Sequence, residues 1–433
     1  MAPIQDHPLR YKLANELHAR PFPTLEAPCH AAYLAIKQPH DAAGRDREAD
    51  LAHLTALLDR FGAKHPQPGA THYFGDLGKH KLKWEQHTEF VTYTIFVDGV
   101  AEKPFDPDSF KVFPEDWLDE MPGTRVTSAL IRVNVIRDED EIQSDIAEWF
   151  VPESVAASRV LDDAAIVAGD FRIDTGGHMR FAVYVRPETG ARRVGRIVQR
   201  LCEIETYKTV SMLGFARARE MSPRMAEIDT DLTRIVGDTC AAEVQSDATL
   251  KALLNISSEL ENLIATSSFR FGATGAYEAL VEQRIKVLRE TRFKGRQTLA
   301  EFMTRRFDPA MRTVKATEQR LQSMAAASIR AGELLRTQVD VDRQAQNQRL
   351  LESMDTRAAL QLRLQKTVEG LSVVAISYYA VNLASYLAYP LSEPMGLSKG
   401  MVTAILTLPV VLGVWLLVHR IRESMEHAPE GDL

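Results

Sequence analysis

The sequence predicts an α+β domain at residues 1–187, a long α-helical bundle and stalk at 188–370, and a C-terminal two-helix transmembrane hairpin. Three observations lead to this fold class. Before residue 187, short β-branched and aromatic runs alternate with turn residues, which is typical of strands. From Arg192 onward, apolar residues recur at helical spacing. Near the C-terminus, two apolar runs at 371–391 and 401–418 contain no formally charged residue.

The first domain is expected to be a mostly antiparallel sheet with a few helices. A short helix ends before Pro21, and strands are expected at 29–38, 71–76, 81–85, 89–97 and 124–137. Helices are predicted at 46–61, 115–120 and 142–150, where segments are amphipathic or begin with acidic residues. Residues 165–173 and 178–186 are expected to form a hairpin around Asp174-Thr-Gly-Gly.

The helical region is expected to break at 222–223, 271–275 and 308–309, where proline or glycine interrupts the pattern. Residues 336–349 are almost all polar, so a strict heptad fails there. Apolar residues resume at Leu350 and continue without a break signal into the first apolar run. We therefore expect one continuous helix from the stalk to the membrane.

The two apolar runs are read as membrane spans, because each is close to the ~20 helical residues that cross ~30 Å of hydrocarbon. Transmembrane helix 1 is predicted at 371–391, a short external loop at 392–400, transmembrane helix 2 at 401–419 and a cytoplasmic tail at 420–433. The alternative is a buried hairpin of a soluble core, but long soluble helices normally keep a polar face.

The charges that flank the spans predict their orientation. Three basic residues precede the first span and three basic or titratable residues follow the second: Arg357, Arg363, Lys366, His419, Arg420 and Arg422. The loop offers Lys399 against Glu393. The positive-inside rule then places both termini in the cytoplasm. Residues 1–12 lack an apolar segment, so no signal peptide is expected.

A polar stripe runs along the first span. Tyr378, Asn382, Ser385 and Tyr389 share one helical face, and Glu393 follows in the loop. One hypothesis is that they line a pore in an oligomer, with Glu393 at its mouth. The alternatives are hydrogen bonds that join protomers and tyrosines that anchor the span at the membrane interface.

Composition and motifs argue against two classes of function. The net charge of −7 leaves no basic excess for phosphates, so no nucleic-acid partner is expected. Phosphate-binding loops of the G-x-x-x-x-G-K-[ST] type, G-x-S-x-G elbows, H-E-x-x-H and G-x-G-x-x-G motifs are absent from the sequence, which predicts that the protein is not an enzyme.

An acidic run at 138–141 is the candidate metal site of the sequence. Asp138, Asp140 and Glu141 are candidate ligands of a hard divalent cation, the one cofactor that the sequence suggests. The alternative, which we favour, is a solvated turn and helix N-terminus, where carboxylates suit the helix dipole.

Three stretches resemble a bacterial family of uncharacterised membrane-anchored proteins of unknown function. They are His-Pro-Leu-Arg-Tyr-Lys-Leu-Ala-Asn-Glu-Leu-His-Ala-Arg-Pro-Phe-Pro-Thr-Leu-Glu-Ala-Pro at 7–28, Arg-Ile-Val-Gln-Arg-Leu-Cys-Glu-Ile-Glu-Thr-Tyr-Lys at 196–208, and the stretch at 361–379 that opens Gln-Leu-Arg-Leu-Gln-Lys. The resemblance implies a protein of the bacterial inner membrane. It supplies no catalytic residues.

The layout also resembles that of CorA-type magnesium transporters, in which a ring of copies surrounds a pore lined by the first span. Their Gly-Met-Asn motif is missing here, because the loop reads Tyr389-Pro-Leu-Ser-Glu-Pro-Met-Gly-Leu. The resemblance implies a self-associating inner-membrane protein that conducts an ion. The alternative is a non-conducting membrane-anchored helical scaffold or sensor that binds protein partners.

Overall fold

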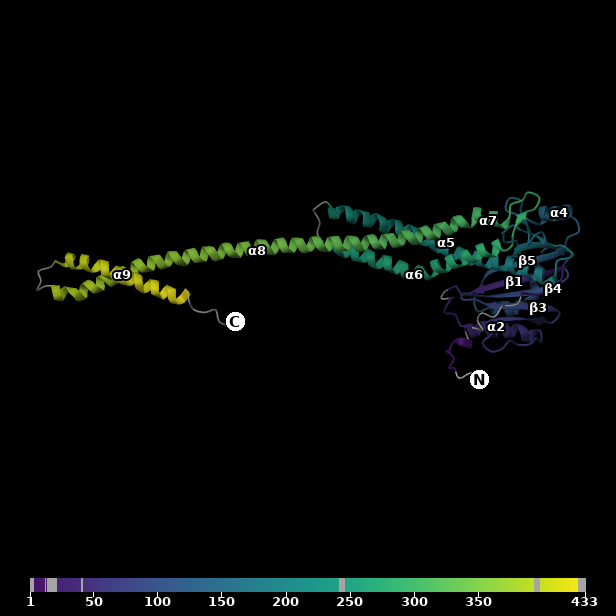
Figure 1. Cartoon of the computed structure of the whole chain (residues 1–433), viewed down its shortest axis with the longest axis horizontal. Coiled ribbons are helices and arrows are strands. Elements are labelled where there is room, and N and C mark those ends of the chain that lie inside the picture. Colours follow the sequence, from purple (N-terminus) through teal and green to yellow (C-terminus); the bar gives the residue numbers. More distant parts are fainter. Residues whose placement is uncertain are drawn as a thin grey trace. The chain divides into compact units, whose positions relative to one another are not determined.

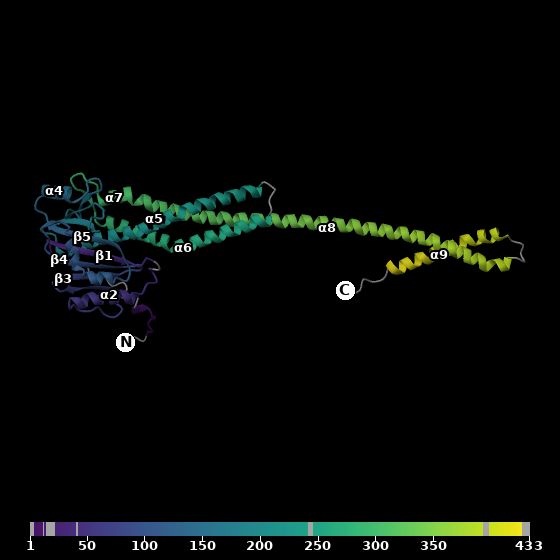
Figure 2. The ribbon, with the colours of Figure 1, turned by 180° about the vertical axis from the view of Figure 1, so that it is seen from behind.

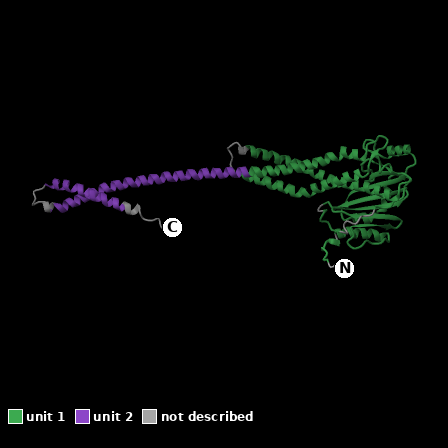
Figure 3. Ribbon diagram, viewed as in Figure 1, with its two compact units in different colours: residues 1–332 green, residues 333–433 purple. Residues whose placement is uncertain are grey.

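The chain forms two compact units. The computed structural model describes residues 4–11, 13, 22–39, 42–240, 246–392 and 398–426. The units comprise residues 1–332 and 333–433 (Figure 3). The predicted change from strands to long helices near residue 187 is present, but the compact units divide at 332. The reason is that the helices following 187 pack on the sheet and share its core.

Unit 1 contains a nine-stranded sheet with the strand order β2-β3-β4-β1-β5-β8-β7-β6-β9 (Figure 1). The pair β5–β8 is parallel, and the other pairs are antiparallel. The α+β class and the mostly antiparallel sheet are thus confirmed. The strands are β1 (Cys29–Lys37), β2 (His72–Leu77), β3 (His80–Gln86), β4 (Phe90–Asp98), β5 (Thr124–Val135), β6 (Ala156–Val160), β7 (Ala165–Gly169), β8 (Met179–Val185) and β9 (Thr291–Arg292).

The central strands are buried on both faces, and alternate residues belong to different cores. On β1, Ala31 and Tyr33 join the core beneath the long helices, whereas Ala32 and Leu34 join a core on the opposite face. This two-sided burial explains why β1 reads as a continuous apolar run in the sequence.

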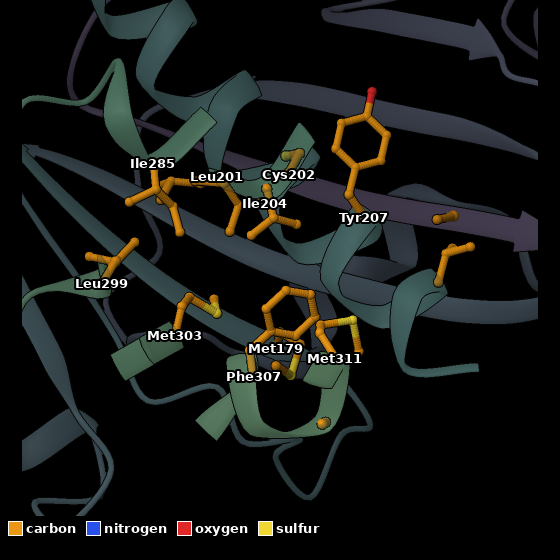
Figure 4. Packing of buried hydrophobic residues seen from close by; sticks show 14 of the residues in the cluster. Met179, Leu201, Cys202, Ile204, Tyr207, Ile285, Leu299, Met303, Phe307 and Met311 are labelled. Atoms are coloured by element: carbon orange, nitrogen blue, oxygen red, sulfur yellow. The ribbon is translucent and has the colours of Figure 1, made fainter. Parts of the chain in front are cut away.

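One face of the sheet is covered by α5 (Ala191–Cys240), α6 (Ser246–Lys286), α7 (Leu299–Arg306) and the first part of α8 (Asp308–Ser392). Helices α5 and α6 pack along each other (Figures 1 and 2). Figure 4 shows Leu201 and Ile204 of α5 and Ile285 of α6 gathered in the same core as Met303 of α7 and Phe307.

Two of the expected helix breaks are wrong. Helix α5 continues through Pro223, and α6 continues through residues 271–275. Proline removes one N–H donor, but tertiary packing of the flanking Met221 and Met225, both buried, outweighs that local loss. The break at 308–309 is confirmed, because α7 ends at Arg306 and α8 begins at Asp308.

The opposite face of the sheet carries two separate apolar clusters. The first lies under α2 (Arg47–Arg60), the 3₁₀ helix η1 (Pro107–Val112) and α3 (Glu115–Asp119), and it includes Trp84 and Trp117. The second lies under α4 (Glu139–Trp149) and includes Ile146 and Phe293. The last residues of β5 lie between these clusters, and there the sheet surface becomes polar.

Unit 2 contains the C-terminal part of α8 together with the whole of α9 (Lys399–Glu426). Helix α8 passes through the polar segment 336–349 and into the first apolar run without interruption, so the predicted continuous helix is confirmed. The second apolar run is also helical, with Pro409 inside α9. Residues 393–397 of the expected loop lie outside the described residues.

Candidate functional site

A cavity of about 320 Å³ lies at the end of β5 in unit 1. It occupies the gap between the two apolar clusters and is bordered by the loop before α4. Its lining residues come from just before β1, just after β4, β5, the loop between β5 and α4, α4 itself and β8. They are Pro28, Val100, Arg132, Asn134, Val135, Arg137, Asp138, Glu141, Ile142, Asp145 and Tyr184.

Strand β5 supplies the basic and amide groups of this cavity. Arg132 and Asn134 occupy alternate positions of β5 and therefore share the face that carries the two clusters. The Arg132 Nη1 donates to the carbonyl of Ala101 at 2.5 Å, and the guanidinium lies 5.6 Å from the ring centre of Trp149. The Arg132 Nε is buried without a hydrogen-bond partner, and desolvation lowers the pKa of this side chain.

Helix α4 supplies the acidic side. Asp145 is half-buried one turn beyond Glu141, and both line the cavity. Tyr184 on β8 donates its hydroxyl to Asp145 Oδ2 at 3.0 Å. Burial raises the pKa of Asp145, and the hydrogen bond from Tyr184 lowers it by a smaller amount. The carboxyl group is thus held where its charge is poorly solvated.

An ion-pair network fixes the start of α4 against the sheet. Glu139 pairs with Arg159 of β6 through two oxygens at 2.7 Å each, and Arg159 also contacts Asp163 at 2.8 Å. Arg186, just after β8, contacts both Glu139 and Asp163. The Arg159 guanidinium lowers the pKa of Glu139. This network positions the acidic wall of the cavity relative to β5.

The three predicted metal ligands take different roles at the start of α4, although Asp138 and Glu141 both line the cavity. Asp138 is the N-cap of α4 and accepts from the backbone N–H of Asp140 at 3.3 Å. Asp140 pairs with Lys294 at 3.1 Å, whereas Glu141 lines the cavity. Among the described residues, no group of three or more His, Cys, Asp or Glu side chains is arranged to hold a metal ion. The arrangement is that of a helix N-terminus.

The described residues of the polar stripe in the first apolar run differ in exposure along α8. Tyr378 is 66% exposed, Asn382 is half-buried, and the Ser385 Oγ is buried without a partner within the described chain. Ser377, outside the stripe, is buried with an equally unpartnered hydroxyl. The side chain of Tyr389 and all of Glu393 lie outside the described residues. Their expected place at a pore stays a prediction.

The first two stretches that carry the family resemblance contact each other, directly and through the residues just before the second stretch. The backbone N–H of Leu25 donates to the carbonyl of Ala191 at 3.1 Å, and Arg196 lies over the ring of Phe22. A Cβ on Gly195 would lie 1.7 Å from the Pro23 carbonyl oxygen, so this close approach needs glycine. The proline-rich segment is therefore docked on the first turns of α5.

Arg132 and Asn134, the basic and amide groups that line the cavity, were not among the site residues predicted from the sequence. A signal was present: Arg132 and Asn134 alternate with apolar residues in the second half of the strand. Polar residues at that spacing indicate a strand whose one face meets water or a ligand. The contribution of Tyr184 and Asp145 depended on the parallel pairing of β5 with β8, for which the sequence contained no direct sign.

Comparison with known proteins gives a family and no activity. The model of a family described as Protein of unknown function (DUF3422) matches residues 5–425. No curated protein matches the chain. These findings give no support to the resemblance to CorA-type transporters, which rested on layout. Because the match extends over nearly the whole sequence, the chain belongs to the DUF3422 family of proteins of unknown function.

Proposed function

We propose that this protein is a membrane-anchored sensor or scaffold: α9 and the end of α8 form a two-span anchor, and unit 1 is a cytoplasmic binding module. One observation carries the proposal. Both helices contain windows apolar and long enough to cross a membrane, and only 6% of each window is buried. Contiguous apolar surface of this extent is unfavourable in water, and lipid would cover it.

The distribution of charge supports the orientation. Arg363 and Lys366 precede the first apolar run, and Arg420 and Arg422 follow the second, whereas Lys399 is the one basic residue between the runs. With basic flanks retained in the cytoplasm, unit 1 lies on the cytoplasmic side. Its polar cavity then faces the solutes of that compartment.

Removing the anchor is expected to release the protein from the membrane. The full chain should remain in the membrane fraction after an alkaline carbonate wash, whereas a chain ending at residue 370 should appear in the soluble fraction. The shortened chain lacks both apolar runs and therefore has no segment that crosses the membrane. It is expected to stay folded, because unit 1 has its own core. A chain ending at residue 426, which keeps both helices, is the matched control and should stay in the membrane.

The opposite result would identify the helices as part of a soluble assembly. If the full chain were soluble without detergent, and monodisperse with the helices protected from proteolysis, then protein and not lipid would cover them. The anchor proposal would then be wrong.

Ion conduction through self-associated first spans is the second candidate. It draws on the hydroxyls of Ser377 and Ser385, which are buried without partners in the described chain and would gain from water or from a neighbouring copy. Replacing Asn382 by leucine should abolish or alter ion flux into proteoliposomes if the first span lines a pore. The control is Leu383→Val, on an exposed position beside it. Equal flux through wild type, both variants and empty vesicles would reject conduction.

A further inference from the structure

The cavity at the end of β5 lies where the topology of the sheet changes. Strand β5 is the middle strand of the nine, with β1 antiparallel on one side and β8 parallel on the other. The two apolar clusters of the outer face belong to the two halves of the sheet and leave the end of β5 uncovered. A crevice at the carboxyl ends of parallel strands, next to a helix N-terminus, is where open sheets commonly hold ligands.

The arginine of the cationic wall, Arg132, forms no ion pair within the described part of the chain. Arg132 has its Nε buried and unpartnered, and no carboxylate of the described chain lies within ion-pair distance of its guanidinium. The neighbouring arginines differ, because Arg159, Arg180 and Arg186 each pair with a carboxylate. Asn134 follows on the same face of β5. The half-buried guanidinium interacts with the Asp145 carboxylate only from beyond ion-pair distance, so a directly bound anion would stabilise it further.

The opposite wall is anionic. Glu141 and Asp145 lie on α4, and the Asp145 carboxyl accepts from Tyr184 but has no basic partner within ion-pair distance in the described structure. An anion bound at this wall would meet two carboxylates, whereas an ammonium group would be attracted to them. The cavity therefore offers opposite charges on facing sides, with the rings of Trp149 and Tyr184, stacked at 6.2 Å, beside them.

We propose that this cavity binds a small zwitterion of the α-amino acid class, with its carboxylate on Arg132 and Asn134 and its ammonium group toward Glu141 and Asp145. The volume of about 320 Å³ is at the small end of ligand pockets and suits such a molecule. Desolvation raises the pKa of Asp145 and lowers the pKa of Arg132 by more than their mutual attraction offsets, which agrees with two charged groups that lack a direct ion-pair partner. The cavity lies wholly in unit 1, so this inference goes beyond the membrane proposal and is independent of it.

The test is a titration of the detergent-purified full chain with the common α-amino acids, followed by calorimetry and by tryptophan fluorescence. For each amino acid that binds, the corresponding amine without the carboxylate and the carboxylic acid without the amine are titrated in parallel, as is MgCl₂. We expect saturable binding of at least one amino acid. Trp149 should report it, because its ring contacts Arg132, and the signal change should disappear in Trp149→Phe while the heat of binding remains.

Variants of both walls complete the test. Arg132→Met and Glu141→Gln should each weaken binding about 10- to 100-fold, the usual effect of losing a charged hydrogen bond. Glu141 is exposed, so Glu141→Gln tests the site even if Arg132→Met folds poorly. Arg192→Met, at an exposed position outside the cavity, should leave binding unchanged.

Four results would overturn the inference. The first is that no amino acid binds, and the second is that neither wall variant weakens the binding. The third is that a carboxylic acid binds as tightly as the amino acid. The fourth is that an amine or Mg²⁺ binds as tightly as the amino acid. The third would make the cavity an anion site, and the fourth would make it a cation site on α4.

Discussion

Replacing Arg45 by alanine is expected to lower the free energy of unfolding of unit 1 by about 3–5 kcal/mol. The Arg45 guanidinium is buried and pairs with Asp50, whose side chain is equally buried, at 2.8 Å. It also donates to four backbone carbonyls at 2.5–3.2 Å, those of Ala42, His87, Thr88 and Phe90. The alanine variant would leave the buried Asp50 carboxylate without its counter-charge and remove the guanidinium donor from these carbonyls, which is the main source of the loss.

Urea unfolding of the detergent-purified chain, followed by tryptophan fluorescence, measures this effect. Arg47→Ala is the matched control, since Arg47 is exposed and lies two residues away. The double variant Arg45→Met/Asp50→Leu should recover a large part of the stability, because it removes both buried charges together. If Arg45→Ala and Arg47→Ala unfolded at the same urea concentration, the buried Arg45–Asp50 pair would not stabilise unit 1.

Replacing Trp117 by alanine is expected to lower the free energy of unfolding by a similar amount, about 3–5 kcal/mol. Trp117 is fully buried on the short helix α3 and stacks on His53 of α2 with ring centres 4.0 Å apart. Its indole N–H donates to the His53 carbonyl at 2.9 Å, and His53 Nε2 contacts the Trp117 carbonyl at 3.1 Å. The loss combines a large cavity with the loss of the indole hydrogen bond and of the ring stacking on His53.

The conservative variant Trp117→Phe separates these contributions. It keeps most of the volume and leaves the His53 carbonyl without its donor, so a loss of about 1–3 kcal/mol is expected. The same urea titration measures both variants, with Trp84 as the remaining buried reporter of this core. If Trp117→Phe were as destabilising as Trp117→Ala, the hydrogen bond and not the packing would dominate.

The fold class could be predicted because it depends on local patterns. The aromatic and β-branched run of β4 predicts a strand wherever its partners lie, and the charge-free runs of α8 and α9 predict apolar helices. Strands β6 and β9 were missed, since β9 has two residues and β6 (Ala-Ala-Ser-Arg-Val) has Val160 as its one β-branched residue. The breaks expected at Pro223 and at 271–275 failed because packing of α5 against α6 outweighs local propensity.

The sequence by itself determined where most of the strands, the helical region and the apolar runs lie, because each depends on the side-chain spacing within one segment. The tertiary structure decided which of those segments meet. The parallel pairing of β5 with β8 places Arg132 and Tyr184 on one face of the sheet, 52 positions apart along the chain. The docking of α4 then brings Asp145 to the Tyr184 hydroxyl. Such contacts join distant segments through burial and charge pairing of the whole domain, and no local spacing encodes them.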